Sequence, residues 1–148
     1  MSVTGFVPLT YEPTTFEKNV LIPLVVVSWG RKEPNELVNM KLMIEKMNEY
    51  LVKYRIYSKK GKVAKVSGPR MRKLYHYIRV KNLVPNLVAT SKGYFKTDNR
   101  EQIKDYINSC FERANSFSEV GTALMSQNCI SHEELRNRRK KSRNETGI

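Results

Sequence analysis

The chain has 148 residues, of which 27 are Lys or Arg and 14 are Asp or Glu, so its formal net charge is +13. An apolar content of 40% excludes a wholly disordered chain, and the length allows one modest domain with tails rather than two substantial cores. So large a positive charge indicates a polyanionic partner, because cations that neutralise phosphates release bound counterions.

The positive charge is concentrated in the middle of the chain. Between Glu49 and Asp98 there is no acidic residue, yet there are thirteen Lys and Arg. The flanks nearly cancel, with five basic against six acidic residues up to Glu49 and nine against eight from Asp98 onward. A charge that served only solubility would be spread more evenly, so this distribution favours a nucleic-acid partner.

Residues 1–34 are expected to form an N-terminal arm that contains one apolar strand. The β-branched run from Val20 to Val27 is typical of a strand, and Pro23 would keep it at a sheet edge. This strand could pair with a hairpin or with a second copy of itself, which would make a homodimer. The run ending at Trp29 is too short to cross a bilayer and no signal sequence opens the chain, so we expect no membrane contact and a cytoplasmic location.

Residues 35–120 are expected to form the main domain, which begins with a long helix. Pro34 and Asn35 predict its start, and apolar residues then recur at steps of three and four, at Leu37, Met40, Ile44, Met47, Leu51 and Tyr54. A short second helix is predicted from Ser58 to Val66, weakened by Gly61. The turn at Ser67-Gly68-Pro69 would then join this helix to the next one, as in a helix-turn-helix.

The helix predicted from Pro69 to Lys81 is the candidate recognition helix. Its apolar stripe is Met71, Leu74, Tyr75 and Ile78, and the remaining faces present the residues expected at DNA, namely Arg70, Arg72, Lys73, His76, Tyr77 and Arg79. Outward residues near its start would reach bases in the major groove. A solvated helix face is the alternative, but the acidic residues usual on such faces are absent. Neighbouring lysines are expected on the DNA backbone: Lys59, Lys60, Lys62, Lys65 and Lys81.

A β-hairpin is predicted next. The short runs Leu87-Val88-Ala89 and Tyr94-Phe95 are separated by Ser91-Lys92-Gly93, with glycine at the position that needs a positive φ. A cation on a thin loop beside a recognition helix can approach the DNA backbone or the minor groove. We therefore expect DNA contacts from Ser91, Lys92 and Lys96.

A capped helix is predicted from Asp98 onward, and Gly121 is expected to interrupt it. Its apolar stripe is Ile103, Tyr106, Ile107, Cys110, Phe111, Ala114 and Phe117. Residues 121–148 would form a C-terminal extension whose basic tail adds non-specific affinity for DNA, through Arg138, Arg139, Lys140, Lys141 and Arg143.

The run from Tyr77 to Tyr94, followed by a capped helix that contains Ile103-Lys104-Asp105-Tyr106-Ile107, resembles the small winged-helix DNA-binding proteins of tailed bacteriophages. The resemblance covers about residues 35–120. It implies a mainly α, winged helix-turn-helix fold, with a three-helix core and a β-hairpin wing. It also implies double-stranded DNA binding in phage DNA replication or transcription regulation, in association with the nucleoid of the bacterial host.

No pattern in the chain points to catalysis, a cofactor or a metal. His76 and His132 belong to no metal-binding motif, a glycine-rich nucleotide loop is absent, and the basic region holds no carboxylates for a nuclease. Cys110 and Cys129 are too few to indicate a disulfide framework and are expected to be reduced.

Two other functions remain open. The chain could be a protein-interaction factor that modulates a host protein machine, anchored by the apolar segment Val20 to Trp29. RNA binding has less support, because the aromatic residues form no obvious stacking platform on strands.

Overall fold

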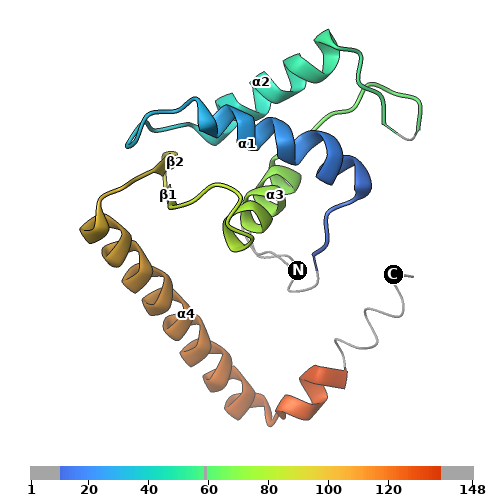
Figure 1. Ribbon diagram of the computed structural model, residues 1–148. Helices are drawn as coiled ribbons and strands as arrows, with labels where there is room; N and C mark the ends of the chain where they lie inside the picture. The colour runs from blue at the N-terminus through green and yellow to red at the C-terminus, as the bar shows by residue number, and fades with distance from the viewer. Residues whose placement is uncertain (1–10, 59, 138–148) are drawn as a thin grey trace. The chain divides into compact units, whose positions relative to one another are not determined.

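The computed structural model of the chain describes residues 11–58 and 60–137, which are mainly helical with one small antiparallel hairpin (Figure 1). The elements in chain order are a π-helix, Glu17–Leu21; α1, Ile22–Gly30; α2, Met40–Lys53; α3, Gly68–Val80; β1, Leu87–Thr90; β2, Gly93–Lys96; and α4, Arg100–Asn128. The chain divides into two compact units, residues 1–103 and residues 104–148. The boundaries expected near residues 34 and 120 do not coincide with this division.

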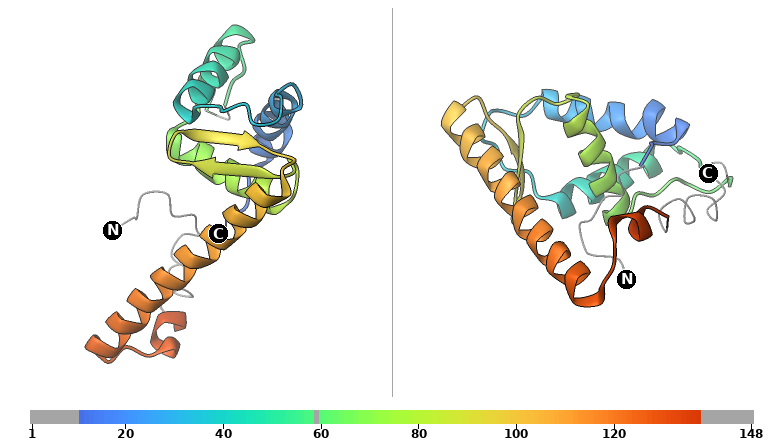
Figure 2. Two further views of the ribbon diagram at one scale, coloured as in Figure 1. Left: turned by 90° about the vertical axis from the view of Figure 1, so that its left-hand side faces the viewer. Right: turned by 90° about the horizontal axis from the view of Figure 1, so that it is seen from below.

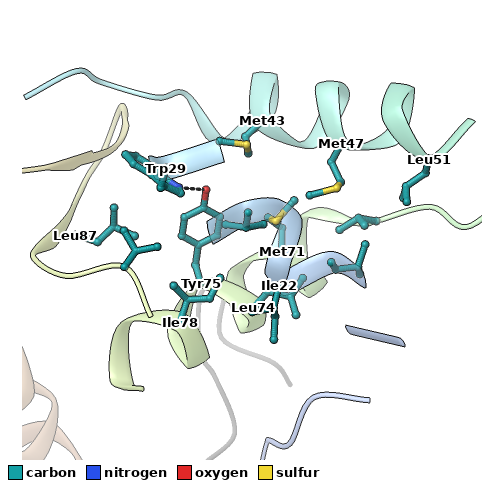
Figure 3. Close-up of a cluster of buried hydrophobic side chains, with 14 of the residues drawn as sticks. Ile22, Trp29, Met43, Met47, Leu51, Met71, Leu74, Tyr75, Ile78 and Leu87 are labelled. Carbon is teal, nitrogen blue, oxygen red and sulfur yellow. Dashed lines mark hydrogen bonds between the residues drawn. The ribbon is translucent and has the colours of Figure 1, made fainter. Parts of the chain in front are cut away.

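Helices α1, α2 and α3 share one hydrophobic core, which β1 extends with Leu87 (Figure 3). The stripe predicted for α3 is confirmed, since its four members are at most 1% exposed. Because α3 is buried along one face only, its other faces are left for charged residues. The largest fully buried side chains are Trp29, Tyr75, Leu21, Leu51, Met71, Leu74 and Ile78.

The segment predicted as an edge strand is helical, so that prediction is wrong. Leu21, Val25 and Trp29 recur every four residues, and each is at most 1% exposed in the core. Burying this helical face outweighs the strand preference of the β-branched residues, which spans only about 1 kcal/mol. Pro23 is the second residue of α1, which follows the π-helix without a break, so this proline lies within a continuous helical run. The N-terminal region therefore builds the core.

Helix α2 begins at Met40, later than predicted. The side chain of Asn39 caps it by accepting the N–H of Leu42 at 3.2 Å. Two residues assigned to the apolar stripe, Leu37 and Tyr54, are 48% and 56% exposed. The buried face of the helix consists of Met43, Met47 and Leu51.

The short helix predicted from Ser58 to Val66 is absent from the described part of that segment. Instead, the N–H of Ser58 donates to the carbonyl of Lys62 at 2.8 Å. An isolated bridge joins Tyr57 to Val63, and Gly61 adopts a positive φ of 74° in the turn. Residues 54–67 thus join α2 to α3, a longer connection than the three or four residues of a helix-turn-helix.

The predicted hairpin is confirmed, and the left view in Figure 2 shows its two strands. A third segment borders it, because Val38 donates its N–H to the Tyr94 carbonyl at 2.7 Å and accepts the Tyr94 N–H at 2.9 Å. Gly93 has a φ of 144°, and a Cβ atom at this position would lie 2.1 Å from the Val38 carbonyl oxygen. Glycine is therefore required here by both conformation and space.

Helix α4, taken by itself, has no buried residue. It is capped by Asn99 rather than Asp98, since the Asn99 side chain accepts the N–H of Gln102 at 3.1 Å. The predicted interruption at Gly121 is wrong, because the helix continues to Asn128. Within the described residues, no helix combines the length and the apolar character that a membrane span requires.

Candidate nucleic-acid interface

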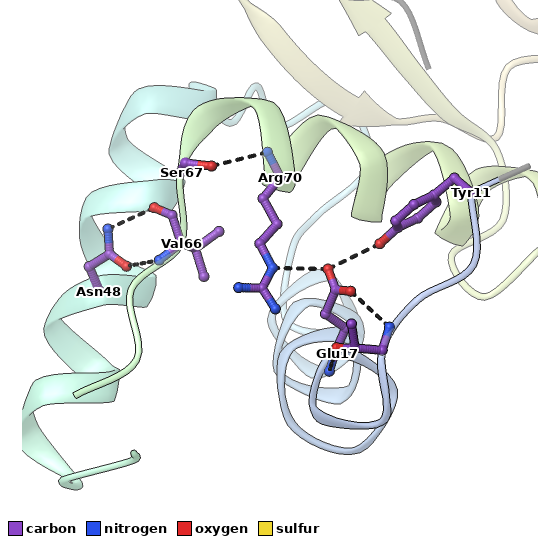
Figure 4. A network of polar contacts seen from close by, with 7 residues as sticks. Tyr11, Glu17, Asn48, Val66, Ser67 and Arg70 are labelled. Atoms are coloured by element: carbon purple, nitrogen blue, oxygen red, sulfur yellow. Dashed lines mark hydrogen bonds and ion pairs between the residues drawn. The ribbon is translucent and has the colours of Figure 1, made fainter. Parts of the chain in front are cut away.

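The start of α3 is fixed against α2 by side-chain hydrogen bonds to the backbone (Figure 4). Asn48 of α2 accepts the N–H of Val66 at 2.7 Å and donates to its carbonyl at 3.1 Å. The next residue, Ser67, caps α3 by accepting the N–H of Arg70 at 3.3 Å. The end of the connection between α2 and α3 is therefore held in place where α3 begins.

Three aromatic residues tie α3 to α1 and to the hairpin. Trp29 donates its indole N–H to the hydroxyl oxygen of Tyr75 at 2.8 Å, with the two rings edge to face. Tyr75 also stacks on Tyr94 of β2, with ring centroids 4.6 Å apart. Burial raises the pKa of the Tyr75 hydroxyl, so the hydroxyl stays uncharged and its oxygen accepts the hydrogen bond from the indole N–H. The hairpin and α3 are thereby held in one orientation.

One side of α3 is occupied by the N-terminal segment (Figure 4). The guanidinium of Arg70 lies 3.0 Å from the carboxylate of Glu17, a residue only 3% exposed. The same carboxylate accepts the Thr14 N–H at 2.8 Å and the Tyr11 hydroxyl at 3.1 Å. Burial alone would raise the pKa of Glu17, but these donors and the Arg70 charge hold it below its ordinary value. Arg70 therefore neutralises a buried acid.

The neighbouring positions on this side also have intramolecular partners. The ammonium of Lys73 lies 5.9 Å from the ring centroid of Tyr11. Tyr77 was predicted to point outward, but it is half-buried and packs against the core. Lys81 lies over the Tyr77 ring, 6.0 Å from its centroid. These contacts occupy this side of α3, so its side chains pack against other parts of the chain.

The other side of α3 carries Arg72, His76 and Arg79, spaced i, i+4 and i+7 and thus on one stripe. Arg72 lies two residues after Arg70, which places it about 200° around the helix. His76 is exposed, and both arginines are partly exposed. The guanidinium of Arg79 lies over Tyr94 at 5.8 Å from its centroid, so the stripe leads to the hairpin.

The other predicted contact residues fall into three groups. Ser91 and Lys92 are exposed at the hairpin tip, whereas Lys96 donates to the Trp29 carbonyl at 2.9 Å. In the connection between α2 and α3, the exposed lysines are Lys60, Lys62 and Lys65. The residues that lie outside the described part of the chain are Lys59, Arg138, Arg139, Lys140, Lys141 and Arg143.

The role of the N-terminal segment was not predicted from the sequence, although a signal was present. Thr14 and Glu17 form a Thr-x-x-Glu capping box, in which the Thr14 hydroxyl accepts the Glu17 N–H at 3.1 Å. This motif indicates a helix start just before the run that we assigned to a strand. No comparable signal points to the pairing of Glu17 with Arg70, because 53 residues separate them.

Nothing in the described residues suggests a metal centre, since no three His, Cys, Asp or Glu side chains are grouped as ligands there. The chemistry that the arrangement offers is the attraction of anions by fixed cations. Comparisons with protein-family models, with curated proteins and with solved structures gave no match.

Proposed function

We propose that the chain binds double-stranded DNA as a winged-helix protein, with α3 in the major groove and the β1–β2 hairpin as the wing. The order of elements supports this assignment: α1, a short bridge segment at Val38, α2, α3 and then a two-stranded hairpin. The long connection between α2 and α3 departs from a compact helix-turn-helix. In this assignment α1, and not residues 35–54, is the first helix of the three-helix core.

The observation that carries the proposal is the stripe of Arg72 and the exposed His76 on the side of α3 away from Glu17, which continues through Arg79 toward Tyr94 of the hairpin. No acidic residue occurs from residue 50 to residue 97, so the stripe has no acidic neighbour within its own segment. Glu17, the acid that reaches α3 from elsewhere, is buried and paired with Arg70. Phosphates approaching Arg72 and the exposed Lys92 would therefore meet positive charge that no acidic residue of the same segment offsets.

The fixed geometry of the surface also supports DNA binding. The Trp29, Tyr75 and Tyr94 contacts hold α3 and the hairpin together before any ligand arrives. A preformed surface pays little ordering entropy on association, which leaves more of the interaction free energy for binding. Exposed lysines of residues 54–67 would extend the contact along the DNA backbone.

The proposal is tested with a charge reversal on the open side, Arg72→Glu, and an equal reversal elsewhere, Lys41→Glu. Lys41 is an exposed residue of α2 outside the acid-free segment, so it is a matched control for net charge. Binding to a fluorescent duplex is measured by anisotropy at several salt concentrations. We expect Arg72→Glu to weaken binding on the order of tenfold or more, and Lys41→Glu to have a much smaller effect. Equal losses for the two variants, or no duplex binding by the wild type, would refute the proposal.

The biological role that we propose is phage DNA replication or transcription regulation, and it rests on the sequence resemblance alone. The rival role as a host-protein adaptor loses its proposed anchor, because Leu21, Ile22, Val25 and Trp29 are buried in the core. A selection of genome fragments by the purified protein distinguishes the DNA roles, since a regulator would enrich promoter segments and a replication factor an origin.

A further inference from the structure

Helix α4 carries an apolar face with a strict seven-residue repeat. Ile103, Cys110, Phe117 and Leu124 are each seven residues apart, and Ile107, Ala114 and Gly121 form a second such series four residues further on. The opposite face has its own series, made of the acidic residues Asp105, Glu112 and Glu119. A sustained seven-residue repeat is typical of a helix that pairs with another helix along its length.

This face is exposed for most of the length of α4. Phe111 is 66% exposed, Phe117 73% and Leu124 51%, and no residue of the helix is buried. An isolated helix gains too little from its own hydrogen bonds to be stable in water, so its apolar face requires a partner.

The length of α4 restricts which helix can be that partner. Its 29 residues correspond to about 43 Å, whereas α2, the longest of the other named helices, has 14 residues, or about 21 Å. The apolar faces of α1, α2 and α3 are also already used in the core. Among the described helices, only the α4 of another molecule matches α4 in length and repeat.

The charges of α4 fit such a pairing. The helix has three basic residues, Arg100, Lys104 and Arg113, against four acidic ones, Glu101, Asp105, Glu112 and Glu119. It is therefore nearly neutral within a chain of net charge +13. Two copies of the basic middle segment would repel each other, but two copies of α4 would not.

The available area also suffices. An aromatic side chain buries about 150–250 Å², so the two exposed phenylalanines from each of two helices would supply on the order of 600 Å². A stable protein interface buries at least roughly 1,200 Å² in total, and Ile103, Ile107 and Leu124 of the same face, with Val120 at its margin, would supply the remainder.

We propose that α4 is a self-association helix, through which a second copy of this chain pairs with the first along the Ile103 to Leu124 face. The pairing replaces the route to a homodimer considered from the sequence, which used the segment now seen as α1. It does not depend on DNA binding, although two paired chains would present two α3 helices and so raise the affinity for duplex.

The test is the mass of the full-length chain in solution, measured by sedimentation equilibrium. The protein is treated with nuclease and kept in high salt with a reducing agent, so that neither bound nucleic acid nor a Cys110 disulfide joins the chains. We expect a mass of at least two chains of 17.3 kDa for the wild type. The variant Phe117→Glu, which buries a charge in the interface, should weaken association on the order of tenfold or more and yield single chains.

The matched control is Asn115→Glu, which adds the same charge on the polar side of α4 and should leave the mass unchanged. The fluorescence of Trp29, the only tryptophan, reports whether residues 1–103 remain folded in both variants. A wild type that stays a single chain at all concentrations would overturn the proposal, since α4 would then be covered by its own chain or by nothing. Association by Phe117→Glu as strong as that of the wild type would overturn it equally.

Discussion

The two sides of α3 carry similar charges but differ in what those charges contact. On one side, Arg70 pairs with the buried Glu17 and Lys73 lies over Tyr11. On the other, Arg72 and Arg79 are partly exposed and aligned along a stripe that leads to the hairpin. The first side holds the N-terminal segment on the core, and the second is the proposed DNA surface.

The difference shows that a basic helix cannot be interpreted from its charges alone. A helical wheel assigns Arg70 and Arg72 the same chemistry, but the burial of a single carboxylate separates their roles. A buried acid requires a paired cation, and a cation so paired contributes little to the field outside the protein. The most direct test of the proposed function is therefore to mutate one cation on each side of α3 and to compare the effects on stability and on duplex affinity.

The largest effect is expected from Arg70→Ala. The change leaves the carboxylate of Glu17 buried without its cation, so the free energy of unfolding should fall by about 2 kcal/mol. Breaking a fully buried ion pair costs roughly 3–5 kcal/mol. The expected loss is smaller here because the Arg70 side chain is 36% exposed. Urea unfolding measures the loss, and duplex affinity of the folded protein should stay within about twofold of the wild type.

A double variant checks the cause. In a Glu17→Gln background no buried charge remains, so the same Arg70→Ala change should cost clearly less than it does in the wild type. Equal costs in the two backgrounds would mean that Arg70 stabilises the fold through packing of its stem. A large loss of duplex affinity in Arg70→Ala would show instead that both sides of α3 contact DNA.

The converse variant, Arg72→Ala, is expected to affect binding and not folding. Its duplex affinity should fall by about 1–2 kcal/mol, since one phosphate or base contact is lost. Its free energy of unfolding should change by less than about 0.5 kcal/mol, because Arg72 pairs with no buried group among residues 11–58 and 60–137. Duplex anisotropy and urea unfolding are measured on the same preparation. A fall in stability without a fall in duplex affinity would contradict the assignment of Arg72 to the DNA surface.

Local patterns were enough to predict α3 and the hairpin. The apolar stripe of α3 repeats within one helix, and the hairpin depends on a turn of which Gly93 is part. The helical state of α1 was missed because its β-branched residues favour a strand locally, while the buried face of Leu21, Val25 and Trp29 is revealed only by the rest of the core. The different roles of the two sides of α3 could not be predicted either, because they depend on the contact between Glu17 and Arg70, which lie far apart in the sequence.

The next largest effect is the pH dependence of the free energy of unfolding that Glu17 causes. Its folded-state pKa lies below the ordinary 4.5, so the carboxylate stabilises the fold fully above that pH. This contribution is lost as the pH falls through the folded-state pKa. Glu17→Gln should therefore be less stable than the wild type by about 1 kcal/mol at neutral pH, and the gap should close in acid.

Urea unfolding at neutral pH and at several values below 4.5 measures that gap. The control is Glu45→Gln, an exposed acid of α2, for which little gap is expected at any pH. A gap for Glu17→Gln that widens in acid would contradict the pairing of the Glu17 carboxylate with Arg70.

The smallest effect is expected at the hairpin tip, where Lys92→Ala removes one exposed cation. A single phosphate contact contributes modestly, so affinity should fall by about 0.5–1 kcal/mol for every duplex sequence, and the slope of log affinity against log salt should flatten by about one unit. The matched variant is Lys60→Ala, in the connection between α2 and α3. If the DNA followed that connection and not the hairpin, Lys60→Ala would flatten the slope and Lys92→Ala would leave it unchanged. The pair of slopes therefore decides whether the hairpin acts as a wing on the open side of α3.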